Sequence, residues 1–216
     1  MKNCFISLPI TGMVEQSKDR SKVLKECLMS IYPQCNFYIP CEVAPAYDMP
    51  DSYYMGLCVS KLMDCDTVIA CSGWKGSRGC QCEKFIAETY GIEWSTLKSF
   101  CLKTMDSNNL EGTDFYTEDE DSDCTIVTIN IDEGCNMIYN AIWKELQKHS
   151  KFDGHIEIVI NCGKKKLDED VLAMMFYALI CSNKNLCIHI DTSIYCHKSH
   201  IFSTFANVNN EDSYRL

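Results

Sequence analysis

Residues 64–92 read DCDTVIACSGWKGSRGCQCEKFIAETYGI, and the rest of the chain is arranged around this stretch. Its first part, Thr67–Cys71, is a short apolar run with β-branched residues, which is typical of a buried strand. The next part, Ser72–Gly79, holds three glycines and two serines and predicts a turn. From Cys80 the apolar residues recur at helical spacing, and Gly91 is a plausible end of the helix. The stretch therefore predicts a strand, a glycine-rich turn and a helix.

The predicted helix carries a carboxylate, Glu83, close to its start, while Phe85, Ile86 and Tyr90 share one face by spacing. A strand, turn and helix of this kind place free backbone N–H groups and a helix dipole at the end of a sheet, where anions and nucleotides bind. An acid near a helix start is by itself an ordinary residue that the dipole favours. The question is therefore whether Glu83 is a reactive carboxylate.

Length and charge limit the classes of function. With 216 residues, of which 46% are hydrophobic, the chain can hold one large α/β domain or two small ones. A net charge of −10 argues against a nucleic acid polymer as partner, since such binding needs a basic surface. No apolar run is long enough to cross a bilayer, and the first residues show no signal-peptide cleavage pattern. We expect a cytoplasmic protein with no membrane partner.

The 16 cysteines are unusually many. In a short secreted chain they would suggest a disulfide framework, but here residues such as Cys4 and Cys71 replace small apolar residues inside apolar runs, as buried free thiols do. The Cys80-x-Cys82 pair has no partners at zinc-ligand spacing, and the histidines of His197–His200 have no clear third ligand. We expect reduced structural thiols, no metal and no cofactor.

Strands and helices alternate before the central stretch. The pattern predicts a strand, a helix, a strand and a helix over Asn3–Pro9, Ser17–Ile31, Asn36–Val43 and Ser52–Met63. Ser17 is the expected N-cap of its helix, and Pro40 places its strand at an edge or near the strand's own end. This alternation predicts a parallel sheet covered by helices on both faces. Because the carboxyl ends of such strands share one edge, Ser7–Gly12 and Ser72–Gly79 should converge there.

An acidic segment follows the first half of the chain. Ile92–Leu102 reads as a fourth strand or a connection, and Asp106–Asp123 then carries no Lys or Arg, which is typical of a solvated linker. We therefore expect a first domain over 1–103, a linker over 104–123 and a smaller α/β domain of unknown role over 124–216. The elements expected in the last part are Thr125–Ile131, Gly134–Lys148, His155–Asn161, Asp168–Ser182 and Leu186–Ile190, with Tyr139, Trp143 and Phe176 as core residues.

A series of short motifs runs in order through the first half: Phe5–Gly12 (FISLPITG), Pro45-Ala46, Tyr54-Met55, Cys65-Asp66, Gly73-Trp74, Ser77-Arg78-Gly79, Glu83 and Ala87–Ile92. The series resembles the nucleoside 2-deoxyribosyltransferase-like superfamily. It is most similar to a bacterial and phage branch with an Ile-Ser-Gly-Pro-Ile-Thr-Gly start and a Gly-Trp-x-x-Ser-Arg-Gly turn. The resemblance ends near Leu102, and the order of its several parts makes it fairly specific. It implies a flavodoxin-like parallel sheet.

The resemblance also implies a reaction. Enzymes of this superfamily cleave, or transfer a sugar at, the N-glycosidic bond of a deoxynucleoside or its 5′-monophosphate, so the expected partner is a small molecule. The carboxylate that matches Glu83 attacks the anomeric carbon, and the residues that match Ser77 and Gly79 hold the 5′ end of the sugar or its phosphate. No metal takes part. Because relatives commonly assemble as oligomers, a homo-oligomer is expected as well.

Five further residues are candidates for ligand contacts at the same edge. Ser7 and Thr11 either donate hydrogen bonds to a phosphate or serve only the turn, and Ile10 lies between them. Trp74 either walls the site and stacks on a base or plugs the end of the sheet. Arg78, inside the matched turn, pairs with a ligand anion, with the nearby carboxylate or with another surface acid.

Three positions depart from the pattern of the active relatives. Phe5 stands where many have Tyr, Leu8 stands where they have Gly, and Cys58 stands where the active enzymes have an Asp. The first change removes a hydroxyl that would orient the nucleophile, and the last removes a carboxylate that assists the leaving base. Losing an acid–base group typically costs about 10²- to 10⁴-fold in rate. The alternative reading is therefore a catalytically weakened module that binds or senses a nucleotide.

Overall fold

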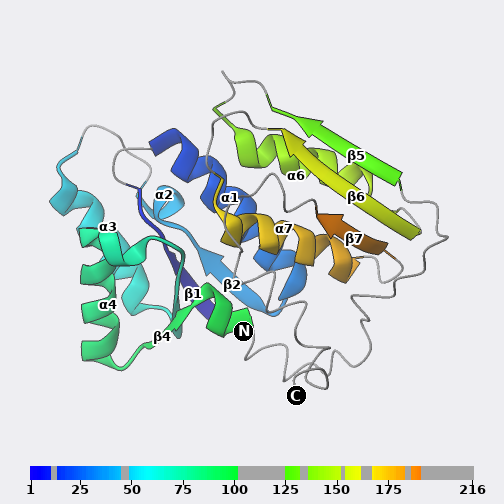
Figure 1. Cartoon of the computed structure of the whole chain (residues 1–216). Helices are drawn as coiled ribbons and strands as arrows, with labels where there is room; N and C mark the ends of the chain where they lie inside the picture. The colour runs from blue at the N-terminus through cyan, green and yellow to red at the C-terminus, as the bar shows by residue number, and fades with distance from the viewer. Residues whose placement is uncertain are drawn as a thin grey trace, which may run out of the picture. The chain divides into compact units, whose positions relative to one another are not determined.

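A computed structural model of the chain describes residues 1–10, 14–44, 49–101, 125–131, 136–151, 154–161, 167–182 and 186–190. The chain divides into two compact units, Met1–Ser107 and Asn108–Leu216 (Figure 1). The acidic segment over 106–123 and His197–His200 lie outside the described residues. All candidate site residues except Thr11 are described, and they belong to the first unit.

The first unit is built on a four-stranded parallel sheet in the order β2-β1-β3-β4. Its strands are β1 (Lys2–Ser7), β2 (Cys35–Tyr38), β3 (Thr67–Ala70) and β4 (Glu93–Thr96). The central strands β1 and β3 are buried over most of their length, as a sheet covered on both faces requires. Ser7 lies opposite Ala70 in the register, so the two central strands end level with each other.

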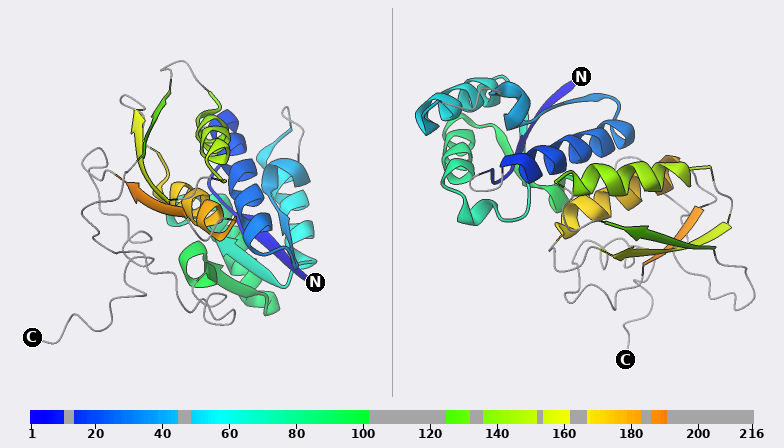
Figure 2. Two further views of the ribbon diagram at one scale, coloured as in Figure 1. Left: turned by 90° about the vertical axis from the view of Figure 1, so that its right-hand side faces the viewer. Right: turned by 90° about the horizontal axis from the view of Figure 1, so that it is seen from above.

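Helices cover both faces of this sheet, as the alternation of elements predicts (Figures 1 and 2). The connecting helices are α1 (Val14–Ile31), α2 (Pro40–Val43), α3 (Asp51–Met63) and α4 (Arg78–Tyr90). Helices α3 and α4 are neighbours on one face, while α1 lies on the other, which is the arrangement that right-handed crossovers produce for this strand order. The unit thus has the expected α/β architecture, consistent with a flavodoxin-like fold.

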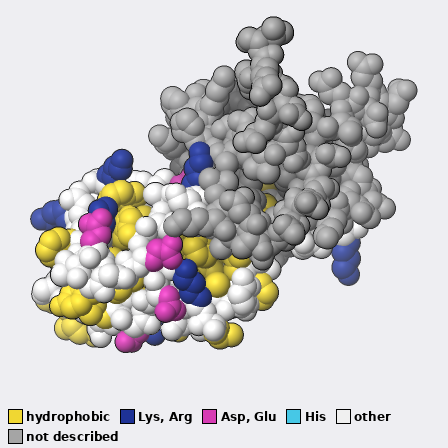
Figure 3. Space-filling model, turned by 90° about the horizontal axis from the view of Figure 1, so that it is seen from below, with side chains coloured by type: hydrophobic (Ala, Val, Ile, Leu, Met, Phe, Trp, Pro, Cys, Tyr) yellow, Lys and Arg dark blue, Asp and Glu magenta, His cyan; other side chains and the backbone are white. Residues whose placement is uncertain are grey.

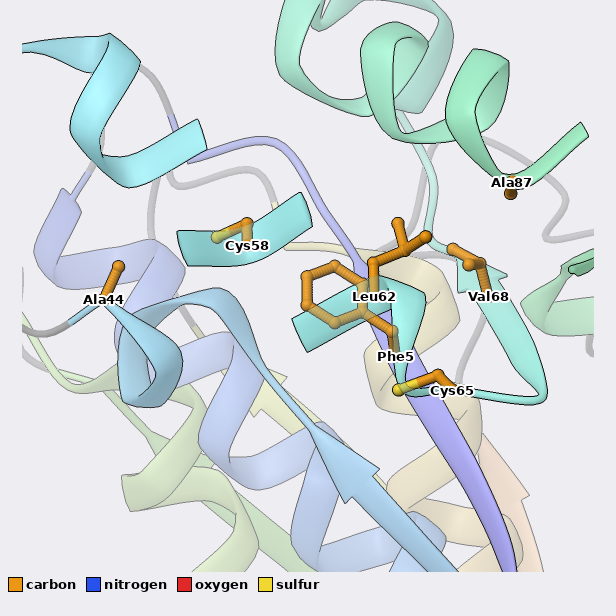
Figure 4. Packing of buried hydrophobic residues seen from close by; sticks show 7 residues of the cluster. All are labelled: Phe5, Ala44, Cys58, Leu62, Cys65, Val68 and Ala87. Carbon is orange, nitrogen blue, oxygen red and sulfur yellow. The ribbon is translucent and has the colours of Figure 1, made fainter. Parts of the chain in front are cut away.

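One cluster of buried side chains packs between the sheet and the helices α3 and α4 (Figure 4). Phe5 and Val68 contribute from adjacent positions of the two central strands, Leu62 contributes from α3, and Ala87 contributes from α4. Ala44, Cys58 and Cys65 complete the cluster. Because each covering element supplies at least one member, this cluster fixes both helices on the sheet.

One predicted strand is wrong in its second half. The sequence predicts a strand over Asn36–Val43, whereas β2 ends at Tyr38 and the short helix α2 begins at Pro40. Proline lacks the N–H that a strand ladder needs, and its fixed φ suits the first turn of a helix. The proline therefore separates two elements instead of marking the edge of one strand.

Other element boundaries shift by a few residues. Ser17 is not an N-cap, because α1 begins at Val14 and the Ser17 hydroxyl donates to the carbonyl oxygen of Pro9 at 3.2 Å. Gly91 ends α4 as predicted, with a left-handed φ of 71°. The segment after it forms β4 and then a helical turn over 97–101.

The second unit holds a three-stranded parallel sheet in the order β5-β6-β7. Its elements are β5 (Thr125–Asn130), α6 (Ile138–Lys148), β6 (Gly154–Asn161), α7 (Glu169–Ser182) and β7 (Leu186–Ile190). Because the strand order follows the chain order, right-handed crossovers put both helices on one face, as Figure 2 shows. Tyr139, Trp143 and Phe176 are buried in this unit, as the sequence predicts.

The cysteines with described side chains are free thiols, and most of them are buried, including Cys4 and Cys71. In this part of the chain no group of three or more His, Cys, Asp or Glu side chains is arranged to hold a metal ion. Among the helices that the structure describes, none combines the length and the apolar composition that crossing a bilayer demands.

The buried cluster predicts a sharp contrast between two neighbouring residues of α3. Leu62 is 0% exposed and Met63 is 41% exposed. Leu62→Ala should lower the free energy of unfolding by about 2–5 kcal/mol, because it opens a cavity under the helix. Met63→Ala should change it by no more than about 0.5 kcal/mol. Urea denaturation of both variants measures the difference, and equal effects would contradict the packing described for this face.

Candidate functional site

The carboxyl ends of β1 and β3 lie where the strand order of the first sheet reverses. From β1 the chain passes through α1 to β2 on one side, and from β3 it passes through α4 to β4 on the other. In open parallel sheets, ligands bind outside the carboxyl ends of the strands at such a switch point. The backbone N–H of Cys71 donates to the carbonyl oxygen of Ser7 at 2.9 Å, which joins the two strand exits.

The loops that follow the two strands lie side by side. Gly73 has a left-handed φ of 80°, and a Cβ atom at this position would lie 3.4 Å from Cγ of Pro9. Both its backbone conformation and the closeness of the first loop therefore favour glycine. The Pro9 carbonyl oxygen also accepts hydrogen bonds from Ser17 and, at 3.1 Å, from Nη2 of Arg20. These contacts tie the first loop to α1.

Glu83 lies in the second turn of α4, on the face that packs against the sheet. Cys80, Glu83 and Ala87 recur at helical spacing and are all buried, whereas Phe85 and Tyr90 are exposed. Figure 3 shows hydrophobic side chains lying among charged ones at the surface. The buried face of α4 is therefore not the one that carries Phe85 and Tyr90, and the carboxylate of Glu83 lies on the buried face.

A short hydrogen bond holds this carboxylate. Oγ of Ser7 donates to Oε2 of Glu83 at 2.5 Å. Ser7 is 0% exposed and Glu83 is 5% exposed. Within the part of the chain that the structure describes, the carboxyl group of Glu83 makes no other hydrogen bond. A strand end and a helix that are far apart in sequence thus meet through one polar contact.

The protonation of Glu83 is set by its surroundings. Burial raises the pKa of Glu83 from 4.5 to about 7, because the charged form loses its hydration. The hydrogen bond from Ser7 lowers the pKa, because it favours the charged form, but this effect is the smaller one. Near neutral pH the carboxyl group is therefore close to its midpoint, and both protonation states are populated.

Phe5 and Cys58, two of the departures from the enzyme pattern, belong to the buried cluster under α3 and α4 (Figure 4). Burial, together with the nearby charge of Glu83, raises the pKa of the Cys58 thiol to about 12. The thiol therefore keeps its proton at neutral pH and is a poor acid. Neither residue supplies the hydroxyl or the carboxylate that the resemblance assigns to its position.

The turn before α4 holds three of the predicted contact residues. Ser77 is the N-cap of α4, and its Oγ accepts a hydrogen bond from the backbone N–H of Cys80 at 3.4 Å. Arg78 is exposed and forms no ion pair with Glu83. Gly79 is partly buried, and a Cβ atom there would lie 3.8 Å from Sδ of Met55, which is an ordinary contact.

The other predicted residues lie at the rims of the two loops. Trp74 is partly buried, and its ring packs edge to face against the ring of Trp94 of β4, with the ring centroids 5.4 Å apart. Ile10 is partly exposed at the end of the described part of the first loop, and Thr11 lies outside the described residues. The structure thus brings Ser7 and Glu83 into contact, while Ile10, Trp74 and Arg78 form no hydrogen bond or ion pair with that pair among the described residues.

Sequence reasoning missed Arg20 and Cys80. Burial raises the pKa of the Cys80 thiol, while the hydroxyls of Ser7 and Ser77 and the charge of Arg20 lower it. A cation thus lies near the first turn of α4. One signal was available, since Arg20 follows Ser17 by three residues, so both face the first loop from the same side of α1.

The raised pKa of Glu83 predicts a pH-dependent gain in stability on Glu83→Gln. Between pH 4.5 and about 7 the folded state binds more protons than the unfolded chain, so the free energy of unfolding falls as pH rises. Glutamine does not titrate, so its burial does not lower the free energy of unfolding as the pH rises. The free energy of unfolding of the variant, minus that of the wild type, should therefore grow by roughly 2–3 kcal/mol from pH 5 to pH 8.

Urea denaturation at both pH values measures this difference. Glu88→Gln is the matched control, because Glu88 lies on the same helix with its side chain 56% exposed. Its difference from the wild type should change by less than about 0.5 kcal/mol. A constant difference for Glu83→Gln at the two pH values would show that the carboxyl group has an ordinary pKa.

Comparison with known proteins identifies one family in the first unit. Residues 2–95 match the model of a family described as a domain of unknown function (DUF4406), which is less than half of the 216 residues. Neither the curated proteins nor the solved structures give a match to the chain. The matched range contains β1, β2 and β3 in full and β4 up to Ser95, together with Ser7 and Glu83.

Proposed function

We propose that the first unit cleaves the N-glycosidic bond of a nucleoside or a nucleoside 5′-monophosphate, by hydrolysis or by transfer of the deoxyribosyl group, with Glu83 as the nucleophile. The observation that carries this proposal is the buried carboxylate of Glu83, held by Ser7 at the switch point of a parallel sheet. The reaction class comes from the motif resemblance over the first half of the chain.

The chemistry suits a single carboxylate. Departure of the base leaves positive charge on the sugar in an oxocarbenium-like transition state, which an ionised carboxylate stabilises. An oxygen of Glu83 attacks C1′, the C1′–N bond breaks, and the base departs with the bonding electrons and takes up a proton. Water or a second base then attacks C1′ and releases the carboxylate from the glycosyl ester. Only the ionised form of Glu83 is competent for the first step.

The turn before α4 supplies the contacts for the 5′ end of the sugar in this scheme. The Ser77 oxygen accepts from the backbone of Cys80, so the hydroxyl hydrogen of Ser77 can donate to a sugar or phosphate oxygen. Gly79 adds a backbone N–H group at the start of α4, where the helix dipole favours negative charge. Ile10, Trp74 and Arg78 complete the proposed contacts, and Arg20 adds a positive charge near the first turn of α4.

A second candidate function is nucleotide binding without turnover. The observation that favours it is the environment of Phe5 and Cys58, which are packed in the core and provide no acid for the leaving base. A site with a poised carboxylate but no proton donor would bind the same ligands and release base slowly. The two candidates therefore differ in turnover and agree in ligand class.

The first candidate predicts base release that depends on Glu83. The full chain is incubated with a panel of 2′-deoxynucleosides and their 5′-monophosphates, and free base is measured by mass spectrometry. Glu83→Gln should reduce the rate by about 10³-fold or more, because the nucleophile is lost. Glu88→Gln, an exposed change on the same helix, should leave the rate unchanged.

Absence of base release across the panel would refute the first candidate. A thermal shift with a mononucleotide, preserved in Glu83→Gln and without free base, would instead support the binding module. No thermal shift with any member of the panel would exclude both candidates.

A further inference from the structure

The contact between Ser7 and Glu83 joins residues 76 positions apart, and it involves a hydroxyl that the sequence assigns to ligand binding or to a turn. We propose that Ser7 is a positioning residue for Glu83. This inference rests on the proposed role of Glu83 and assigns the orienting task to a residue of the chain itself.

Both partners of the contact are fixed by their backbones. Ser7 is the last residue of a strand that pairs on both sides, and its carbonyl oxygen accepts from Cys71. Glu83 lies on a helix that is capped by Ser77 at one end and Gly91 at the other. A side chain on a rigid strand end can hold a carboxylate far more closely than a loop residue can.

The hydroxyl hydrogen of Ser7 determines the direction of the contact. An ionised Glu83 only accepts, so the single hydroxyl hydrogen of Ser7 points to Oε2.

This hydrogen bond has a consequence for the nucleophile. Ser7 occupies Oε2, and no hydrogen bond to Oε1 is formed within the described residues. Oε1 is therefore the oxygen left to attack a sugar, and the carboxyl plane is fixed by the other oxygen. Ser7 and Phe5 are two residues apart on β1 and share a face. Ser7 therefore supplies to Glu83 the orienting hydroxyl that Phe5 lacks.

The test measures the pKa of Glu83 directly, by carboxyl ¹³C NMR of the full chain with labelled glutamate, with the Glu83 signal assigned from its absence in Glu83→Gln. Ser7→Ala should raise this pKa by about one unit or more, because a hydrogen bond to the charged form is lost. Ser7→Thr keeps the hydroxyl and should restore the wild-type value.

Ser95→Ala is the matched control. Ser95 is 4% exposed on β4 of the same sheet, and its hydroxyl contacts the backbone of Thr96 instead of Glu83. It should leave the Glu83 pKa unchanged. An unchanged pKa in Ser7→Ala, or equal shifts in Ser7→Ala and Ser95→Ala, would overturn the positioning role.

Activity gives a second and separable readout. With a substrate from the panel, Ser7→Ala should lower kcat at pH 7 by about tenfold or more with little change in KM, and the midpoint of the pH–rate curve should move up with the pKa. If the pKa moves in Ser7→Ala while Glu83→Gln still releases base at the full rate, the proposed function of Glu83 fails and the contact stands. If kcat falls while the pKa and the pH midpoint stay at their wild-type values, the loss is structural and the positioning role fails.

Discussion

The parallel pairing of β1 with β3 is the constraint on which the rest of the first unit depends. It sets Ser7 opposite Ala70, so both strands end at the same level and their loops leave side by side. The N–H of Cys71 then closes on the carbonyl oxygen of Ser7, and Gly73 lets the second loop pass close to Pro9. Because α4 starts from this second loop, the same pairing also determines where Glu83 meets the sheet.

Burying a carboxylate at this point has opposite effects on stability and chemistry. The packing of α4 against the sheet removes water from around Glu83, which raises its pKa to about 7 and costs folding free energy as the pH rises from 4.5 to about 7. The same removal of water leaves the ionised carboxylate poorly solvated, which suits it to stabilise positive charge on a sugar. An acid that only capped a helix or lay on its solvent-exposed face would not need to be buried. The burial of Glu83 therefore favours the proposed chemical role.

The sequence predicted the strand, turn and helix of the central stretch and the helix end at Gly91, because those features depend on local backbone preferences. It failed for Asn36–Val43, where a proline that begins a helix was interpreted as an interruption of a strand. It also failed to find the buried face of α4, because Phe85 and Tyr90 dominate the apolar pattern while the smaller Cys80 and Ala87 face the sheet. Size and hydrophobicity in sequence do not reveal which face a neighbouring element will cover.

By itself, the sequence determined the alternation of elements, the parallel sheet that follows from it and the placing of two loops at one edge, since each depends on short-range periodicity and on the handedness of crossovers. Only the tertiary structure decided that Ser7 donates to the carboxylate of Glu83 and that Phe5 and Cys58 lie in the buried cluster under α3 and α4. The physical reason is that the pKa and the orientation of a side chain depend on burial and on partners distant in sequence. Those quantities do not exist until the chain has folded.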